Sequence, residues 1–254
     1  MPRGAFFQSF WFGANMSPYQ WLCMRSFLAH GHRFALYVYE STNVPDGVET
    51  RDARTILPRD QIFFYKQGPG AGSVAAFANL FRYKLLRDRG GWWVDTDVVC
   101  LSGEMPDSEV IFARQHDESV GNAVLKLPRG HPLALTLYAE AKREGDDLTW
   151  GQTGPALITR LIAGGAYESS ILPADFCYPI GWEEFGVVFD SAERDSLKRR
   201  VGNSKMVHLW NELWRRANFD YRSPPPAGSF LADLFETTGL KFEEALGMIG
   251  APTP

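Results

Sequence analysis

The sequence predicts an α/β fold built on a mostly parallel, mixed sheet flanked by helices. Its 254 residues are 45% hydrophobic and 14% aromatic, which is enough to fill a sizeable core. Apolar runs with the period of a strand alternate along the chain with runs of helical period. This alternation is typical of strands joined by crossover helices, which pair in parallel. We expect residues 1–254 to form a single domain, with residues 222–254 as a C-terminal extension that wraps its outside.

Capping residues, prolines and glycines mark the elements of the first half. Ser17 is a capping residue followed by a first-turn proline, Ser73 is expected to cap a second helix, and Gly90-Gly91 end that helix. The run from Trp92 is rich in β-branched and aromatic residues. The expected elements are, in order, a strand at 6–12, a helix from 18, a strand at 33–39, a polar loop at 41–58, a helix after 73 and a strand at 92–101.

The second half continues the alternation. Thr153-Gly154-Pro155 is a typical helix start, and the segment at 192–201 has a helical period with many charges. The expected elements are strands at 110–114 and near 123–127, helices at 132–143 and 155–162, a strand within 171–179, helices at 192–201, 230–236 and 242–248, and a strand at 206–210.

Two aspartates in the strand after the double glycine are the best indication of function. In an extended strand, Asp95 and Asp97 project to the same side, about 7 Å apart at their backbones. Because 15 Asp in 254 residues give about one Asp-x-Asp triplet by chance, the pair gains its weight from the apolar strand around it. Two carboxylates aimed at one point suit Mg²⁺ or Mn²⁺, which protein sites bind together with substrate phosphates. The alternative is that both acids lie on a solvated edge.

Composition argues against several other classes of protein. The formal net charge of -4, without a basic stripe interleaved with aromatic residues, makes nucleic acid an unexpected partner. Cys23, Cys100 and Cys177 lie far apart without CxxC pairing, so neither a disulfide framework nor a structural zinc site is indicated. No long apolar run or signal-peptide pattern occurs, so we expect a cytoplasmic chain without a transmembrane segment. Basic residues between 194 and 222 leave peripheral contact with a membrane open.

Several short motifs resemble one family of enzymes. They are Phe10-Trp11-Phe12-Gly13, Ser17-Pro18, Arg25-Ser26-Phe27, Gly31-His32, the helix with Arg82, Gly90-Gly91 with Asp95-Thr96-Asp97, Thr153-Gly154-Pro155 with Thr159-Arg160, and His208-Leu209-Trp210-Asn211. The chain resembles the DXD-motif glycosyltransferases, in the branch related to α-1,4-galactosyltransferases, α-1,4-N-acetylglucosaminyltransferases and bacterial capsular or surface polysaccharide glycosyltransferases. The resemblance implies a GT-A fold, a Rossmann-like sheet whose strand ends hold a nucleotide sugar with Mn²⁺ or Mg²⁺ on its diphosphate.

The resemblance also implies roles for the acids and for a late histidine. Asp97 is implied as the closer metal ligand and as catalytic, Asp95 as a contact to the ribose or sugar that also reaches the metal, and His208 as a third metal ligand. A structural histidine at a strand end is the alternative for His208. We further expect Gln152 near the reacting carbon, as a second catalytic candidate, because an amide carbonyl can support a developing positive charge.

A larger set of residues is implied in binding the sugar nucleotide. These are Trp11, Phe12, Gly13, Asn79, Arg82, Trp93, Asp95, Trp210 and Asn211. Asn79 stands where many relatives have Asp, so it adds hydrogen-bond donors and removes one negative charge. The alternatives are a solvated position for Arg82 and core positions for Trp11 and Trp93.

The expected reaction is transfer of a sugar from a UDP-sugar to the hydroxyl of a glycan, glycolipid or other acceptor, as in polysaccharide biosynthesis. The metal is expected to act as a Lewis acid on the departing diphosphate. Retention of the anomeric configuration is implied by the resemblance alone. Acceptor recognition is expected in variable loops, at Trp150, Trp182, Glu183 and Glu184.

Two other functions stay open at this point. A phosphatase of the haloacid dehalogenase type also carries an Asp-x-Asp pair at a strand end with Mg²⁺, and Asp146-Asp147 would then be its late acidic ligands. Against it, the pair lies past residue 90 rather than near the start of the chain. The second alternative is a catalytically inactive relative that binds a sugar nucleotide.

Overall fold

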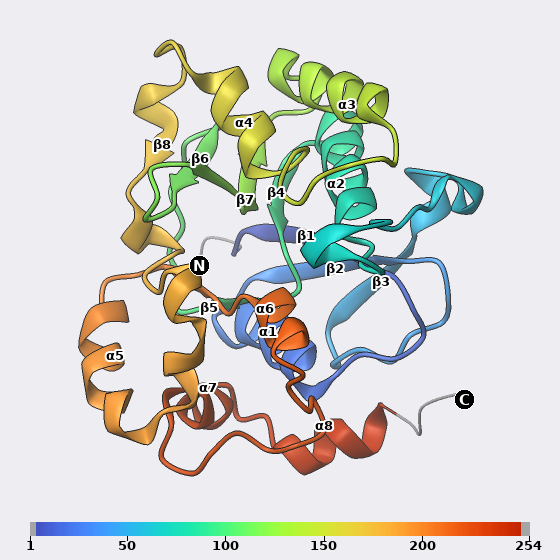
Figure 1. Cartoon of the computed structure of the whole chain (residues 1–254). Coiled ribbons are helices and arrows are strands. Elements are labelled where there is room, and N and C mark those ends of the chain that lie inside the picture. The colour runs from blue at the N-terminus through green and yellow to red at the C-terminus, as the bar shows by residue number, and fades with distance from the viewer. Residues whose placement is uncertain (1–3, 250–254) are drawn as a thin grey trace.

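The computed structural model describes residues 4–249, which contain a large and a small β-sheet. The large sheet has seven strands in the order β3-β2-β1-β4-β7-β6-β8, and helices cover both of its faces (Figure 1). Its strands are β1 (Phe6–Trp11), β2 (Arg33–Val38), β3 (Val48–Asp52), β4 (Gly91–Val94), β6 (Ile111–Arg114), β7 (Val120–Leu127) and β8 (Ile171–Leu172). The small sheet pairs β5 (Val98–Cys100) with β9 (Met206–His208).

The large sheet is mostly parallel. Within the described residues, β7 alone runs against its neighbours, β4 and β6, and the other adjacent strands pair in parallel. The chain moves from β1 outward to β2 and β3, then returns to the other side of β1 to form β4. The predicted α/β fold, a mostly parallel mixed sheet flanked by helices, is confirmed, and it agrees with the GT-A architecture that the resemblance implied.

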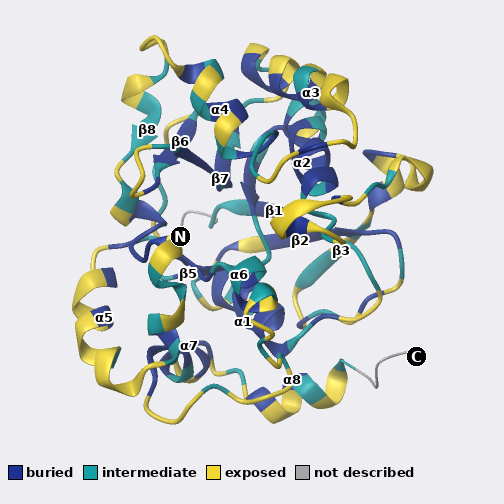
Figure 2. Ribbon diagram, viewed as in Figure 1, coloured by how far each residue is buried: buried dark blue, intermediate teal, exposed yellow. Residues whose placement is uncertain are grey.

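Different helices cover the two faces of the large sheet. The first group is α2 (Ala75–Arg89), α3 (Pro132–Glu144) and α4 (Pro155–Ile162), and the opposite face is covered by α1 (Pro18–Ala29) (Figure 1). On the α2 side, Phe10 stacks on Phe81 with ring centroids 4.4 Å apart. On the α1 side, Phe7 packs against Phe27 at 4.5 Å. The sheet strands are therefore largely buried (Figure 2), and each large apolar side chain contributes about 1.5–3 kcal/mol through burial.

The small sheet lies in a second group of helices formed by the last third of the chain. These helices are α5 (Arg194–Val201), α6 (Asn211–Arg216), α7 (Phe230–Thr238) and α8 (Phe242–Met248). Their common core includes Trp214, Phe235 and Phe242, and these three rings surround Tyr19 of α1. Helix α1 therefore belongs to both halves, because its Met24 and Phe27 face the large sheet.

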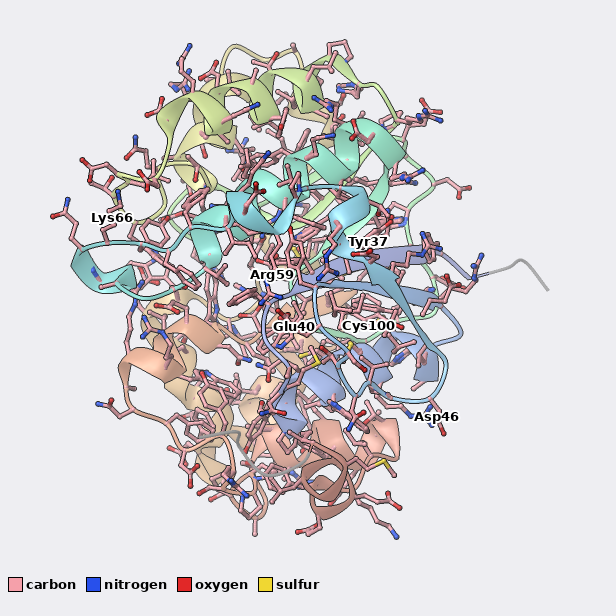
Figure 3. All side chains as sticks on the ribbon, turned by 90° about the vertical axis from the view of Figure 1, so that its right-hand side faces the viewer. Tyr37, Glu40, Asp46, Arg59, Lys66 and Cys100 are labelled. Carbon is pink, nitrogen blue, oxygen red and sulfur yellow. The ribbon has the colours of Figure 1, made fainter. Side chains whose placement is uncertain are left out.

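The edge strand β3 corrects one prediction. Residues 41–58 were expected to be a polar loop, but β3 (Val48–Asp52) pairs in parallel with β2 within them. The strand is VETRD in sequence and is half exposed, and charged side chains of this kind suit the solvent-facing edge of a sheet. The segments beside it carry Asp46 and the pair formed by Glu40 and Arg59 (Figure 3).

Other predicted elements differ in their bounds. The expected strand at 92–101 is two strands, β4 and β5, which belong to different sheets. Residue Val74 holds the N-cap position of α2, although the Ser73 hydroxyl accepts a hydrogen bond from the backbone N–H of Ala75. Only Ile171–Leu172 of the 171–179 segment is a strand. Helix α6 was not predicted at all.

Helices α7 and α8 of the proposed C-terminal extension both contact α1, and residues 250–254 lie outside the described range. The division of the chain into one domain with a wrapping extension stays a prediction. No helix within residues 4–249 combines the length and the apolar character needed to cross a membrane.

Candidate functional site

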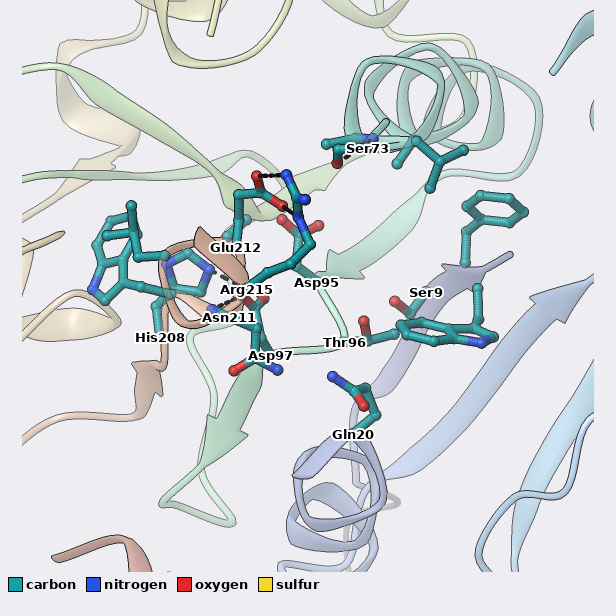
Figure 4. A pocket seen from close by; sticks show the side chains of 18 of the residues that line it. Ser9, Gln20, Ser73, Asp95, Thr96, Asp97, His208, Asn211, Glu212 and Arg215 are labelled. Carbon is teal, nitrogen blue, oxygen red and sulfur yellow. Dashed lines mark hydrogen bonds and ion pairs between the residues drawn. The ribbon is translucent and has the colours of Figure 1, made fainter. Parts of the chain in front are cut away.

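A large cavity lies at the carboxyl ends of the strands of the parallel sheet. Its volume is about 1080 Å³, and it is lined by the ends of β1 and β4, the first turn of α1, helix α2 and helix α6 (Figure 4). Ligands of open α/β sheets bind at this edge. The cavity therefore lies where the strand order predicts a binding site.

The Asp95-Thr96-Asp97 segment lies in this cavity as a turn rather than as a strand. The backbone N–H of Asp95 donates to Ala123 of β7, and the N–H of Val98 donates back to the carbonyl of Asp95 at 3.2 Å. The chain then enters β5, and the N–H of Leu209 donates to the carbonyl of Asp97. The prediction that both acids extend from one strand face is wrong, because the chain crosses from one sheet to the other between them. Both side chains still line the cavity.

Asp95 is held by groups from the large sheet and α2. Its Oδ1 accepts hydrogen bonds from Arg82 Nη2 at 2.5 Å and from the indole Nε1 of Trp93 at 2.7 Å. The Arg82 side chain is only 3% exposed, lies over the Trp93 ring, and also donates to the Asn122 carbonyl. Burial raises the pKa of Asp95 and the neighbouring Asp97 adds to it, which outweighs the lowering by Arg82.

Asp97 is held by groups from the small sheet and α6. Its Oδ1 lies 3.1 Å from Nε2 of His208, and its Oδ2 accepts from the backbone N–H of Asn211 at 2.9 Å. Burial by itself raises the pKa of Asp97, but His208 and the two hydrogen bonds outweigh it and hold the pKa below its ordinary value. Asp97 is therefore the carboxylate that stays ionised most readily.

Asp95, Asp97 and His208 converge on one point. Each offers one ligand atom, and these atoms lie within 4.8 Å of one another. Two carboxylates and one imidazole form a donor set that Mn²⁺ and Mg²⁺ accept. Two carboxylates placed side by side, with the charge of each penalising the other, also favour a cation between them. The residues present thus fit a divalent metal site.

The residue before α6 has an unusual backbone. Trp210 has a φ of 59°, in the left-handed region that a bulky residue rarely adopts. Its indole Nε1 donates to the Ile180 carbonyl, and its ring lies 4.1 Å from the His208 ring, centroid to centroid. This turn aims the Asn211 N–H at Asp97. The Asn211 side chain, which is 9% exposed and lines the cavity, has no hydrogen-bond partner within residues 4–249.

Helix α6 also brings charged groups that the sequence analysis did not place at the site. Glu212 pairs with both Arg215 and Arg216, and these three residues line the cavity. The Arg216 guanidinium lies 4.2 Å above the Trp150 ring. Their position in the sequence, directly after the motif with His208, was the feature that could have indicated them.

A second missed residue lies beside Arg82. The Asn122 amide donates to Oδ1 of Asn79 at 2.7 Å, and both residues line the cavity. The available indication was an amide side chain within the mostly apolar strand β7. Asn79 is 7% exposed, so its side chain is held by the protein.

The structure gathers most of the predicted site residues. Those that line the cavity are Trp11, Phe12, Asn79, Arg82, Trp93, Asp95, Asp97, His208, Trp210 and Asn211. Gly13 and Gln152 do not line it, and the Gln152 amide is bonded to Glu144 and Thr149. Of the residues expected in acceptor recognition, Trp150 and Trp182 line the cavity, whereas Glu183 and Glu184 do not. The roles of these residues stay predictions.

Comparison with known proteins identifies the relatives of the chain. Residues 126–232 match the model of the alpha 1,4-glycosyltransferase conserved region, a range that includes His208 and Asn211 but not the aspartates. Lactosylceramide 4-alpha-galactosyltransferases of Pongo pygmaeus and Homo sapiens are each 24% identical over 153 residues, 56% of this chain. That alignment spans 70% of the first protein and 43% of the second, and the chain spans about half the length or less of the other curated relatives it matches.

The chain is also similar to a solved structure, that of galactosyltransferase LgtC in complex with donor and acceptor sugar analogs. The match has 13% identity, a TM-score of 0.48, and covers 98% of this chain and 97% of that one. The family identification depends on the sequence matches. Residues 126–232 match the conserved region of the α-1,4-glycosyltransferases, and the chain is similar in sequence to glycosyltransferases that contain this region.

Proposed function

We propose that the chain transfers a sugar from a UDP-sugar to an acceptor hydroxyl, with a divalent cation bound by Asp95, Asp97 and His208. The observation that carries the proposal is the convergence of these three side chains in the cavity at the strand ends. The match to the α-1,4-glycosyltransferase region supports it independently. Retention of the anomeric configuration is part of the proposal and is supported by the family resemblance.

Bound Mn²⁺ or Mg²⁺ would supply Lewis-acid stabilisation of the charge that develops on the departing diphosphate. The residues of the chain prepare this site. Both donors to Asp95, from Arg82 and Trp93, meet Oδ1, and no residue among 4–249 donates to its Oδ2. This oxygen is therefore free to face a cation. His208 and the Asn211 N–H fix the orientation of Asp97 through its Oδ1 and Oδ2, respectively.

The size and lining of the cavity suit two substrates. Its volume of about 1080 Å³ lies slightly above the usual range for small-molecule sites, about 300–1,000 Å³. Trp150 and Trp182 line it and are 40% and 44% exposed. Exposed aromatic rings on a cavity wall provide flat apolar surface for the C–H face of a sugar. We assign these two residues to the acceptor, which is a glycan, glycolipid or other hydroxyl compound.

The phosphatase alternative is not favoured. Asp146 and Asp147, its late acidic ligands, do not line the cavity, and Asp146 pairs with Lys66 on an exposed loop (Figure 3). The relatives identified from the sequence are glycosyltransferases.

A turnover assay distinguishes a glycosyltransferase from a phosphatase and from an inactive relative. We expect the protein with MnCl₂ to hydrolyse or transfer the sugar of at least one UDP-sugar, to lose this activity in EDTA, and to leave p-nitrophenyl phosphate intact. An inactive relative would bind UDP with Mn²⁺ in a calorimeter without turnover of any donor. Undiminished turnover in EDTA, or turnover of p-nitrophenyl phosphate alone, would contradict the proposal.

A further inference from the structure

Part of the cavity floor has polar groups that the metal site and its supports do not use. Ser9 of β1 lines the cavity and is fully buried, and its hydroxyl has no hydrogen-bond partner within residues 4–249. Thr96, between the aspartates, and Gln20, in the first turn of α1, line the same part of the cavity (Figure 4). A buried polar group without a partner costs about 1–3 kcal/mol. A ligand that pairs with it would remove that cost.

The N-terminus of α1 fixes which end of the Gln20 amide faces the cavity. The backbone N–H of Ser17 donates to Oε1 of Gln20 at 2.8 Å, as part of a capping box in which the Ser17 hydroxyl also contacts this oxygen. A backbone N–H can only donate, so the atom that it meets must be the amide oxygen. The Nε2 group is therefore left for the cavity, and no residue among 4–249 accepts from it. The cavity presents an N–H donor of fixed orientation.

The topology of the sheet indicates which kind of ligand binds at these polar groups. Strands β1 and β4 are adjacent; β1 leads to β2 and β3 on one side, and the chain returns from β3 to form β4 on the other side of β1. In open α/β sheets, nucleotides bind in the crevice at this kind of switch point. Ser9 lies in β1, and Thr96 lies two residues after the end of β4. Trp11, in β1 two residues after Ser9, also lines the cavity and adds an aromatic surface.

We propose that Gln20, with the hydroxyls of Ser9 and Thr96, recognises the nucleoside of the donor. This inference rests on the proposed function and extends it to residues that hold neither the metal nor the transferred sugar. Gln20 Nε2 donates to an acceptor oxygen of the nucleoside, either a ribose hydroxyl or a pyrimidine carbonyl. Because the Gln20 oxygen is occupied by Ser17, an amino group at the same place would meet a second N–H and be disfavoured.

Gln20→Glu tests the inference with little disturbance of the fold. Glutamate is the usual partner in a capping box, so it keeps the bond to the Ser17 N–H while replacing the Nε2 donor by an oxygen. We expect the affinity for UDP in MnCl₂, measured by calorimetry, to fall about tenfold. The affinity for pyrophosphate in MnCl₂, which has no nucleoside, should be unchanged.

The arms of this experiment give distinct results. Equal weakening of UDP and pyrophosphate would show a general effect of the added charge and would overturn the inference, as would unchanged UDP affinity. If 2′-deoxy-UDP shows no loss with the variant, Gln20 reads the 2′-hydroxyl; if it shows the same loss, Gln20 reads the base or the 3′-hydroxyl, and either result supports the inference. Failure of the wild-type protein to bind UDP with Mn²⁺ would instead overturn the proposed function.

Ser9→Ala is a second test, in which the stability of the protein and its affinity for UDP are expected to respond differently. Removal of a buried hydroxyl without a partner should leave the free protein as stable as before or more stable. The affinity for UDP should nevertheless fall severalfold, because the ligand loses a hydrogen-bond partner. Unchanged UDP affinity in a folded Ser9→Ala protein would remove Ser9 from the proposed site.

Discussion

Asp95 and Asp97 are two residues apart in sequence but belong to different regions of the molecule. Asp95 is bonded to Arg82 of α2 and Trp93 of β4, on the side of the large sheet. Asp97 is bonded to His208 of β9 and to the N–H of Asn211, on the side of the small sheet. The candidate cation site therefore lies on the seam between the two sheets, and any ion bound there joins them.

The two regions shift the pKa of an aspartate carboxyl group in opposite directions. Burial raises the pKa of Asp95, and the Arg82 cation only partly compensates. The pKa of Asp97 is lowered, since His208 and two hydrogen bonds outweigh its burial. The negative charge of Asp97 is thus available for a metal, whereas that of Asp95 is shared with a buried guanidinium. We expect Asp97 to contribute more to metal binding.

Asp97→Asn should have the largest effect. The amide keeps the shape and still accepts from the Asn211 N–H, but it removes the ionised ligand. Loss of groups that only support metal ligands costs 10–100-fold, so we expect a loss of at least about a hundredfold in metal-dependent kcat/KM with a UDP-sugar. Asp46→Asn, on an exposed loop (Figure 3), is the matched control for the change of charge. Full activity of a folded Asp97→Asn protein would remove Asp97 from the site.

Arg82→Met should have the next largest effect, on stability. It leaves the largely buried Asp95, whose side chain is 26% exposed, beside Asp97 without its cation. Loss of one partner of a buried pair costs about 3 kcal/mol, measured by urea unfolding. The double variant Arg82→Met/Asp95→Asn should recover part of this loss, because no unpaired charge remains. If the single variant costs less than about 1 kcal/mol, Arg82 does not hold the large-sheet side as described.

The large sheet was more predictable from sequence than the seam. Strands such as β1 and β2, and helices such as α1 with its Ser17-Pro18 start, follow local periodicity and capping, and they lie within a residue or two of their predicted bounds. The turn at Asp95 could not be predicted in this way. Val98, Val99 and Cys100 pair with a strand that starts at Met206, and no local pattern records a pairing over so long a separation.

The residues of the candidate site were likewise predictable only in part, where short sequence motifs pointed to them. Motif resemblance selected His208 and Asn211, which the structure brings to Asp97. Amide chemistry suggested Gln152, which bonds to Glu144 and does not line the cavity. Asn122 and Gln20 were missed: Asn122 is positioned by Asn79 of another element, and Gln20, although fixed locally by the capping box of α1, reaches the cavity only through the packing of that helix against the sheet. Chemistry-bearing residue types were visible in the sequence, but the direction of their side chains was not.

Mn²⁺ itself should stabilise the protein by joining the two sides. Binding to the native state at ten times the dissociation constant raises the free energy of unfolding by about 1.4 kcal/mol. A thermal-shift series in MnCl₂ should show this rise in the wild type and in Asp46→Asn, and no rise in Asp97→Asn. A rise of equal size in Asp97→Asn would place the ion elsewhere and would contradict a site on the seam.

The smallest predicted effect concerns the outside of the small-sheet region. Hydrogen bonds from Arg194 outweigh a partial burial and, with Lys198, hold the pKa of Asp233 below its usual value. A lowered pKa in the folded state means that the stabilisation is complete above the unfolded pKa of about 3.9 and disappears as the pH falls through the lower folded value. Because Arg194 and Lys198 are 38% and 45% exposed, we expect Asp233→Asn to cost only about 1 kcal/mol at pH 7.

Unfolding of the wild type and Asp233→Asn at pH 7 and at acid pH checks this prediction. The difference between them should be present at pH 7 and should shrink steadily below about pH 4, as the wild-type carboxylate takes up a proton. Asp233 also lies in the first turn of α7, where a negative charge favours the helix, so high salt should reduce the difference without abolishing it. A difference that is constant with pH would mean that Asp233 acts by its shape. The small-sheet region would then be held by its apolar core around Tyr19 and Trp214, as the large sheet is held by Phe10 and Phe81.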